Sequence, residues 1–185
     1  AALDAHRRLA PHRPGLLTII VPRHPQRGPE IAALAERQGL PSTRRALDAL
    51  PTPASAVYVA DTLGEMGLFY SLCDTVFIGG TLNDTGGHNA FEAARLGCAI
   101  VAGSSDFNFS ESYAEFTANG AMCRIHDAAG LGDAIGILLT DAGKRRGMAN
   151  AALALARAGS GATQRAAEAL ITLLPAPARR NIGHA

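Results

Sequence analysis

The residues best suited to chemistry lie in the segment GGTLNDTGGHNAFE at positions 79–92. It combines two glycine pairs, a histidine and an N-x-x-E pattern, at Gly79, Gly80, Gly86, Gly87, His88, Asn89 and Glu92. A glycine-rich turn that runs into a helix N-terminus offers an anion free N–H groups and the positive end of the helix dipole. We therefore expect a phosphate site here. In the alternative interpretation, the glycines only make a tight turn and the N-x-x-E pair is only a capping box.

A second candidate is the segment PRHPQR at positions 22–27, directly after an apolar run. Pro22 restricts the backbone, and Arg23 and His24 follow it. Because a guanidinium offers paired donors to phosphate oxygens, Arg23 is a candidate phosphate ligand. The alternative is a solvated loop arginine beside a histidine that packs on its neighbour.

Two further loops have unusual compositions. In DTLGEM (61–66), Thr62 and Glu65 have the spacing of a capping box, which is a sufficient structural explanation for both. Gly64 is less expected inside a first helical turn, and its missing side chain lets a flat base approach the backbone. In GSSDFNF (103–109), Asn108 can line the same cleft, although its flanking phenylalanines are more typical of a core.

Composition and spacing exclude several functions. Neither G-x-G-x-x-G nor a P-loop occurs, which argues against NAD and ATP. The net charge of +1 predicts no basic face and no nucleic-acid partner. The cysteines Cys73, Cys98 and Cys123 match no metal spacing, so we expect reduced, buried thiols in a cytosolic domain. We expect neither a membrane span nor a signal peptide.

Apolar runs that alternate with helical patterns must position these loops. The strands are expected at 16–21, 57–60, 75–79, 99–103 and 121–125. The helices are expected at 30–38, 64–73, 89–96 and 110–119, followed by two or three alanine-rich helices over 131–174. This alternation predicts a Rossmann-like, doubly wound α/β domain with a parallel sheet. Such sheets bind ligands beyond the carboxyl ends of their strands, where all four loops follow.

In identity, order and spacing, PRHPQR, DTLGEM, FIGGT, GGHNAFEAA and the NF pair resemble the Kdo (3-deoxy-D-manno-octulosonic acid) transferases. That family has two Rossmann-like domains facing across a cleft, the GT-B arrangement, and this chain is similar to the C-terminal donor domain. The resemblance places CMP contacts at Pro22, Arg23, Leu63, Gly64, Glu65, Asn89, Ala90, Phe91 and Glu92. The sequence departs from the family's pattern at Thr81 and Ala90, where serine and proline are usual, and at 103–106.

The resemblance implies a glycosyltransferase of lipopolysaccharide biosynthesis that moves Kdo from CMP-Kdo to a lipid A precursor. The family's catalytic glutamate, acceptor site and membrane-associating segment, at the cytoplasmic face of the inner membrane, belong to an N-terminal half. We therefore expect residues 1–185 to form a single donor domain, truncated within its first helix, with no catalytic residue and no activity alone. CMP has one phosphate, so we expect no metal.

Two alternatives stay open at this point. Another GT-B enzyme, such as a UDP-sugar transferase or a 2-epimerase, shares the glycine-rich turn and the helix glutamate but not PRH together with DT-x-GE. The other alternative is a binding-only remnant that lacks the catalytic half.

Overall fold

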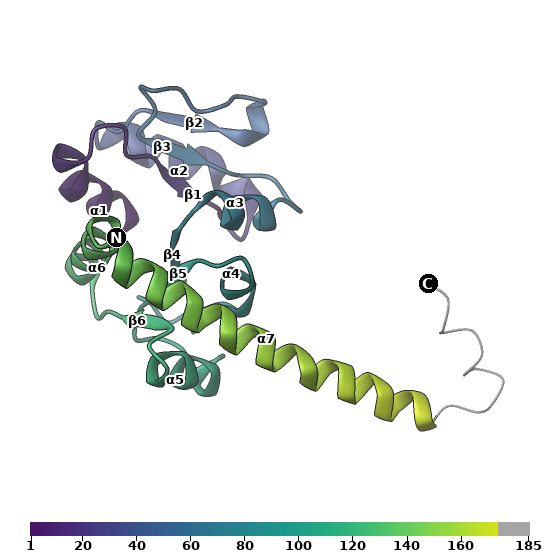
Figure 1. The fold of residues 1–185 in the computed structure, drawn as a ribbon. Coiled ribbons are helices and arrows are strands. Elements are labelled where there is room, and N and C mark those ends of the chain that lie inside the picture. Colours follow the sequence, from purple (N-terminus) through teal and green to yellow (C-terminus); the bar gives the residue numbers. More distant parts are fainter. Residues whose placement is uncertain (174–185) are drawn as a thin grey trace.

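Parallel strands alternate with helices along the chain (Figure 1). The computed structural model describes the backbone of residues 1–173, and the side chains of that range except 160–167. The strands are β1 (Thr18–Ile20), β2 (Ser42–Arg44), β3 (Val57–Val59), β4 (Thr75–Ile78), β5 (Ala99–Ala102) and β6 (Met122–Arg124). The α-helices are α1 (Ala2–Leu9), α2 (Gly28–Arg37), α3 (Met66–Leu72), α4 (Phe91–Arg95), α5 (Ser110–Ala118), α6 (Ala128–Thr140) and α7 (Ala142–Leu173). The predicted α/β class with parallel strands is confirmed.

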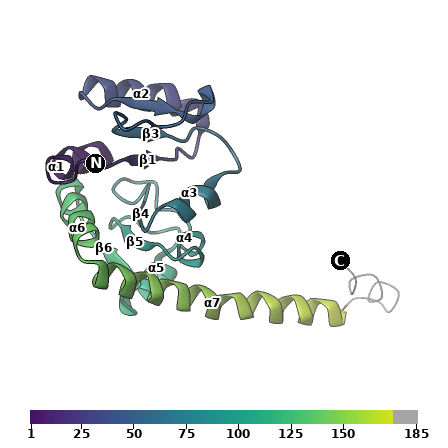
Figure 2. The ribbon, with the colours of Figure 1, turned by 45° about the horizontal axis from the view of Figure 1, so that its top comes forward.

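The strands form two parallel sheets rather than the single sheet that the sequence predicts. One sheet has the order β1-β3-β2 and the other β4-β5-β6. In both ribbon views, β1 and β4 lie on the sides of the two sheets that face each other (Figures 1 and 2). Since no strand of the described chain lies between them, β1 and β4 each keep one unpaired edge.

The central strand of each sheet is buried on both faces. In β5, Ala99 and Val101 pack with α6, while Ile100 and Ala102 pack with α4 and α7. In β3, Val57 and Val59 pack with residues of α1 and α2, while Tyr58 faces Phe69 of α3. Helices therefore cover both faces of each sheet, and this two-sided burial explains why these strands are continuous apolar runs in the sequence.

Most predicted elements are present, with some corrections. The predicted strands and helices are found with ends shifted by a few residues, and the alanine-rich C-terminal region forms two helices, α6 and α7. Leu174, the last residue of that predicted region, lies outside the described residues. Strand β2 was not predicted, because its residues Ser-Thr-Arg are polar and only half-buried. Of the three free cysteines, only Cys98 is buried, so the prediction of buried thiols is wrong for Cys73 and Cys123.

Over the described residues, no helix combines the length and the apolar character that a membrane crossing requires.

A buried histidine links α1 to the first sheet and gives a testable pH dependence. His6 Nδ1 lies 2.9 Å from the Thr18 hydroxyl, and burial lowers the pKa of His6 below its ordinary 6.5. The unfolded chain therefore binds a proton at His6 more readily than the folded chain does. As a result, His6 lowers the free energy of unfolding as the pH falls below about 6.5, and has no such effect at higher pH.

We expect the Tm to decrease from about pH 7.5 to about pH 5.5, and to decrease less in His6→Gln, which removes the titrating group. Thermal unfolding followed by circular dichroism across this range measures both slopes. His88, whose pKa burial also lowers, contributes equally to the two proteins. An identical slope in the variant would contradict the assignment to His6.

Candidate functional site

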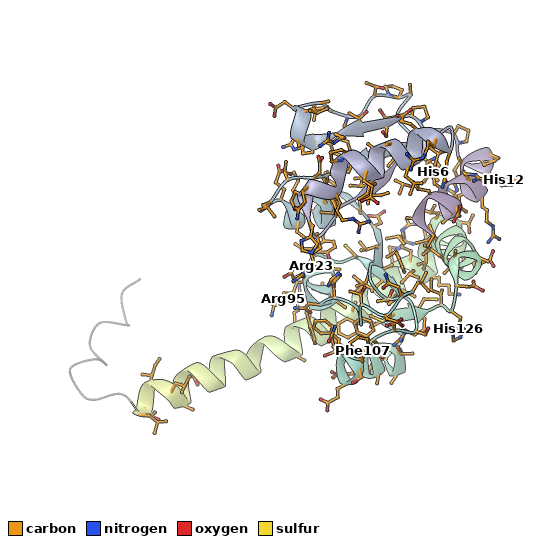
Figure 3. The ribbon with its side chains drawn as sticks, turned by 180° about the vertical axis from the view of Figure 1, so that it is seen from behind. His6, His12, Arg23, Arg95, Phe107 and His126 are labelled. Carbon is orange, nitrogen blue, oxygen red and sulfur yellow. The ribbon has the colours of Figure 1, made fainter. Side chains whose placement is uncertain are left out.

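The four loops named from the sequence lie at the carboxyl ends of their strands, as predicted. They follow β1, β3, β4 and β5, and the strands of each sheet run parallel. Burial lowers the pKa of His88, and the charge of Arg23 lowers it further, so the loops after β1 and β4 are within electrostatic reach of each other. Figure 3 shows Arg23, Arg95 and Phe107 on one side of the molecule and His6 and His12 on the other.

The glycine-rich loop needs its glycines. Gly80, Gly86 and Gly87 have φ of 71°, 81° and 77°, which side-chain-bearing residues rarely adopt. The Gly87 N–H donates to the Gly80 carbonyl oxygen at 2.9 Å and closes the loop. A Cβ at Gly86 would lie 2.6 Å from the side chains of Phe107 and Asn108. The loop is therefore a fixed, tightly packed turn.

Buried polar side chains fix this loop from below. The Thr81 hydroxyl donates to the Ile78 carbonyl at 2.6 Å and accepts from the Gly103 N–H at 2.7 Å, which ties the ends of β4 and β5 together. The Tyr113 hydroxyl donates to the His88 carbonyl at 2.6 Å. These contacts hold the loop backbone in place without any bound group.

The fourth loop packs against the glycine-rich loop. The Asn108 amide side chain donates to the Thr85 carbonyl at 2.9 Å, and its backbone N–H donates to Gly86 at 3.3 Å. Arg124 pairs with Asp106 at 2.8 Å and donates from Nε to the Gly103 carbonyl at 2.9 Å. Asn108 therefore supports the glycine-rich loop, and the suggestion that it lines the cleft stays a prediction.

The helix that follows the glycine-rich loop is shorter than predicted. α4 begins at Phe91, whose N–H donates to Asn89 Oδ1 at 2.9 Å. The alternative interpretation of Asn89 and Glu92 as a capping box is wrong, because Glu92 is exposed and makes no capping hydrogen bond. A helix of five residues has a weak dipole, so an anion here depends on the loop N–H groups and on nearby cations.

Two of the predicted site residues direct their side chains into the core. Ala90 is 2% exposed, and the Phe91 ring packs edge-on against Phe116 with centroids 5.0 Å apart. Only their backbone atoms can face a ligand. Glu92, by contrast, is exposed at the start of α4.

The loop after β3 presents an open backbone. Leu63 is 80% exposed, and Gly64 has φ of 81° with open space where a Cβ would stand. The helix α3 begins at Met66, after the predicted start, and Glu65 does not cap the backbone as predicted. Its carboxylate instead accepts from the Thr62 hydroxyl and from Arg45, and these hydrogen bonds, that of Arg45 first, lower the pKa of Glu65 to about 2.

The same loop begins at a buried carboxylate. Asp61 is 3% exposed and accepts from Arg44 Nε at 2.8 Å and from the Ala46 N–H at 2.9 Å. Burial alone raises the pKa of Asp61, but these hydrogen bonds outweigh it and hold the pKa below its ordinary value. Gly28 leaves the room that this carboxylate needs, because a Cβ there would lie 1.9 Å from Asp61.

The loop after β1 carries the cation of the site. Arg23 and His24 are exposed and Pro22 is half-buried. Within the described part of the chain, Arg23 is in none of the ion pairs, so its guanidinium is available to an anion.

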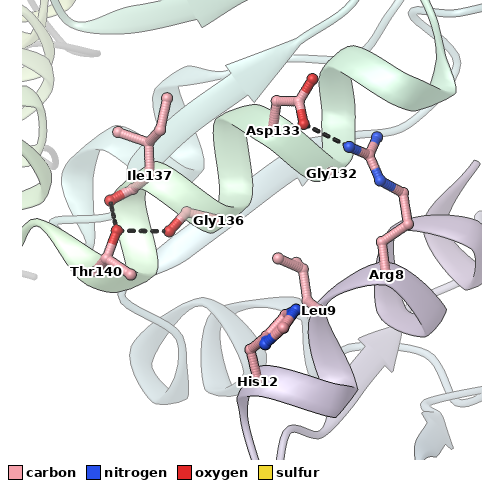
Figure 4. A pocket seen from close by; sticks show the side chains of 8 residues that line it. All are labelled: Arg8, Leu9, His12, Gly132, Asp133, Gly136, Ile137 and Thr140. Atoms are coloured by element: carbon pink, nitrogen blue, oxygen red, sulfur yellow. Dashed lines mark hydrogen bonds and ion pairs between the residues drawn. The ribbon is translucent and has the colours of Figure 1, made fainter.

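A hollow of about 670 Å³ lies elsewhere, between α1 and α6 (Figure 4). Apolar surface dominates its lining, which includes Leu9, Gly136 and Ile137, and the Arg8–Asp133 ion pair at 2.6 Å crosses it. A smaller hollow of about 200 Å³ lies beside Asn108. Over the described residues, no three His, Cys, Asp or Glu side chains gather as a metal site would require. The polar groups that could bind an anion, Arg23 and the backbone N–H groups of the glycine-rich loop, therefore lie at the loops and not in the larger hollow.

Sequence reasoning missed the residues that hold the loops. These are Arg44, Arg45, Thr81 as a loop anchor, Tyr113 and Arg124. The sequence offered one signal for these residues, the consecutive arginines Arg44 and Arg45 after the polar Ser42 and Thr43. Their role becomes recognisable only when β2 is known to be a strand that pairs with β3.

No protein-family model matches the chain. The chain is 39% identical over 170 residues to a 3-deoxy-D-manno-octulosonic acid transferase of Bordetella pertussis, covering 91% of this chain and 39% of that protein. It is 32% identical over 181 residues to the protein of the same name from Haemophilus influenzae, covering 97% and 42% respectively. The chain thus spans about two fifths of the length of the curated relatives it matches.

One solved structure is similar over most of its length. It is the crystal structure of the C-terminal CMP-Kdo binding domain of WaaA from Acinetobacter baumannii. The TM-score is 0.78 at 31% identity, and the alignment covers 82% of this chain and 79% of that one.

The packing of the glycine-rich loop can be tested with a matched pair of variants. Gly86→Ala should destabilise the fold by about 2–3 kcal/mol, because the left-handed backbone costs about 1–2 kcal/mol and displacement of Asn108 breaks a bond worth about 1 kcal/mol. Gly97→Ala, with φ of 76° and open space, should cost only the backbone part. Denaturant unfolding measures both, and equal losses would contradict the packing against Asn108.

Proposed function

The chain belongs to the Kdo transferase family, and from that premise we propose that its four loops bind the sugar donor CMP-Kdo. The observation that carries the proposal is the position of Arg23, a cation without an ion-pair partner in the described chain, within electrostatic reach of the glycine-rich loop. A cation beside a rigid turn of backbone N–H groups suits one phosphate.

Three of the four loops contact the donor in this proposal, and the loop after β5 supports the glycine-rich loop. Arg23 and N–H groups of the glycine-rich loop other than that of Gly87 stabilise the charge that develops on the phosphate as CMP leaves, a pre-organised electrostatic effect. The open backbone at Leu63 and Gly64 accommodates the nucleoside. The exposed carboxylate of Glu92 binds the ribose hydroxyls. The single phosphate of CMP offers no diphosphate for a cation to bridge, so the proposal assigns no role to a metal.

The whole protein's reaction is part of the same proposal. A further, N-terminal domain supplies the catalytic base, the lipid A precursor site and the contact with the cytoplasmic face of the inner membrane. The chain of 185 residues then binds the donor but does not transfer Kdo by itself.

The edges of β1 and β4 that lack a partner in the described chain can each accept a further strand. Thr18 and Ile20 bond to β3, and Val76 and Ile78 bond to β5, so the backbone groups of Ile19 and Phe77 point to the open edges. We propose that an additional strand, from chain upstream of these residues, pairs with both edges.

Hydrogen exchange tests this fit. The amides of Ile19 and Phe77 should exchange rapidly in the 185-residue chain and be protected in the protein extended upstream. Equal exchange in the two proteins would contradict the additional strand.

The nucleotide assignment is tested by calorimetric titration of the chain with CMP, UMP, UDP and AMP. We expect CMP to bind most tightly, because Arg23 and the glycine-rich loop suit a single phosphate and the chain belongs to the Kdo transferase family. Equal or tighter binding of UDP would favour a UDP-sugar enzyme. Absence of binding by any of the four would favour a non-functional remnant.

The phosphate role of Arg23 is tested by comparing two ligands. Arg23→Ala should weaken CMP binding by roughly 10- to 100-fold, the loss of a charge-assisted hydrogen bond, and should leave cytidine binding unchanged. Calorimetry of the variant with both ligands measures this. Equal losses for CMP and cytidine would assign Arg23 a structural role.

A further inference from the structure

Two consecutive arginines reach from β2 to the loop after β3. Arg44, the last residue of β2, pairs with Asp61 at 2.7 Å. Arg45, the next residue, donates to Glu65 from Nη2 at 2.7 Å and from Nε at 3.1 Å. Asp61 and Glu65 are the first and last residues of the segment that contains Leu63 and Gly64, so the two arginines fix both of its ends.

The Arg45–Glu65 pair is half-buried and well connected. The side chains are 31% and 27% exposed, and the paired geometry of guanidinium and carboxylate is the stronger form of such a contact. The hydrogen bonds to Glu65, and its negative charge, raise the pKa of Arg45. Both members of the pair therefore stay charged across the physiological pH range.

The contacts leave Glu65 little capacity to bind a ligand. Its Oε2 already accepts from Thr62 and from Arg45 Nε, and its Oε1 accepts from Arg45 Nη2. The adjacent Leu63 and Gly64 are exposed and make none of these contacts. The part of the loop that is open to a nucleoside is thus its backbone, and the carboxylate serves to hold that backbone.

We propose that Arg45 is a positioning residue for nucleotide binding, which acts through Glu65 to hold the Leu63–Gly64 backbone in the conformation that the nucleoside contacts. The inference rests on the proposed function, and it adds a residue outside the four loops. An ordered loop pays no ordering entropy when the ligand binds, so loss of Arg45 weakens binding even though Arg45 touches no ligand atom.

The test compares Arg45→Gln with the unaltered chain by calorimetry, using cytidine and CMP. We expect roughly 3- to 10-fold weaker binding of both ligands by the same factor, because the nucleoside is common to them. A loss confined to CMP would mean that Arg45 contacts the phosphate, and unchanged affinity would leave it a purely structural role. Either outcome would overturn the inference.

A double-mutant cycle tests whether Arg45 acts through Glu65. Glu65→Gln and the double variant should lose the same affinity as Arg45→Gln, since each breaks one shared contact. Additive losses would show that the two residues act separately. The matched control is Arg8→Gln, which breaks the exposed Arg8–Asp133 pair beside α6 and should leave affinity unchanged.

Two further results keep the outcome decisive. If Arg45→Gln does not fold, Arg45→Lys retains the cation but not the paired geometry, and unchanged affinity in it would overturn the inference. If the unaltered chain binds no CMP, the proposed function itself fails; if the unaltered chain binds CMP and the Arg45 variants bind it equally, only this inference fails.

Discussion

The parallel direction of the strands is the constraint on which the rest of the structure depends. Parallel neighbours cannot be joined by tight turns, so each strand returns by a longer crossover, in most cases through an α-helix, and each loop after a strand emerges at the same edge of its sheet. Loops that are far apart in the sequence are therefore brought near one another, as the effect of Arg23 on His88 shows. The fully buried strands β3 and β5 anchor this edge, because helices cover both of their faces.

Buried polar contacts within the chain hold the loops in place. Thr81 and Tyr113 hold the glycine-rich loop from the core, and Asp61 holds the loop after β3. Positive φ at three glycines then lets the chain turn where no other residue fits. Such pre-organisation lets a site stabilise charge without reorganising during the reaction.

The sequence was sufficient to predict the features that depend on apolar periodicity and on glycine. The buried strands are continuous apolar runs, and the loop positions follow from them. The details that depend on tertiary contacts were not predictable. Glu65 and Glu92 have the spacing of a capping box, but neither caps its helix. Glu65 instead pairs with Arg45, and Glu92 stays exposed. Helices α3 and α4 also begin later than expected. Likewise, β2 forms because it pairs with β3, and its polar residues give no strand pattern in the sequence. The roles of Arg44, at its end, and of the following Arg45 were therefore not predictable.

The proposed nucleotide site is the edge formed by the loops and not the larger hollow between α1 and α6. An NMR titration of the isotopically labelled chain with CMP tests this most directly, because it reports on every assigned amide. We expect shift changes at Arg23, at Leu63–Glu65 and at the loop from Gly86 to Glu92, with Leu9 and Gly136 unaffected. Changes centred on Leu9 and Gly136, with the loops unchanged, would contradict it.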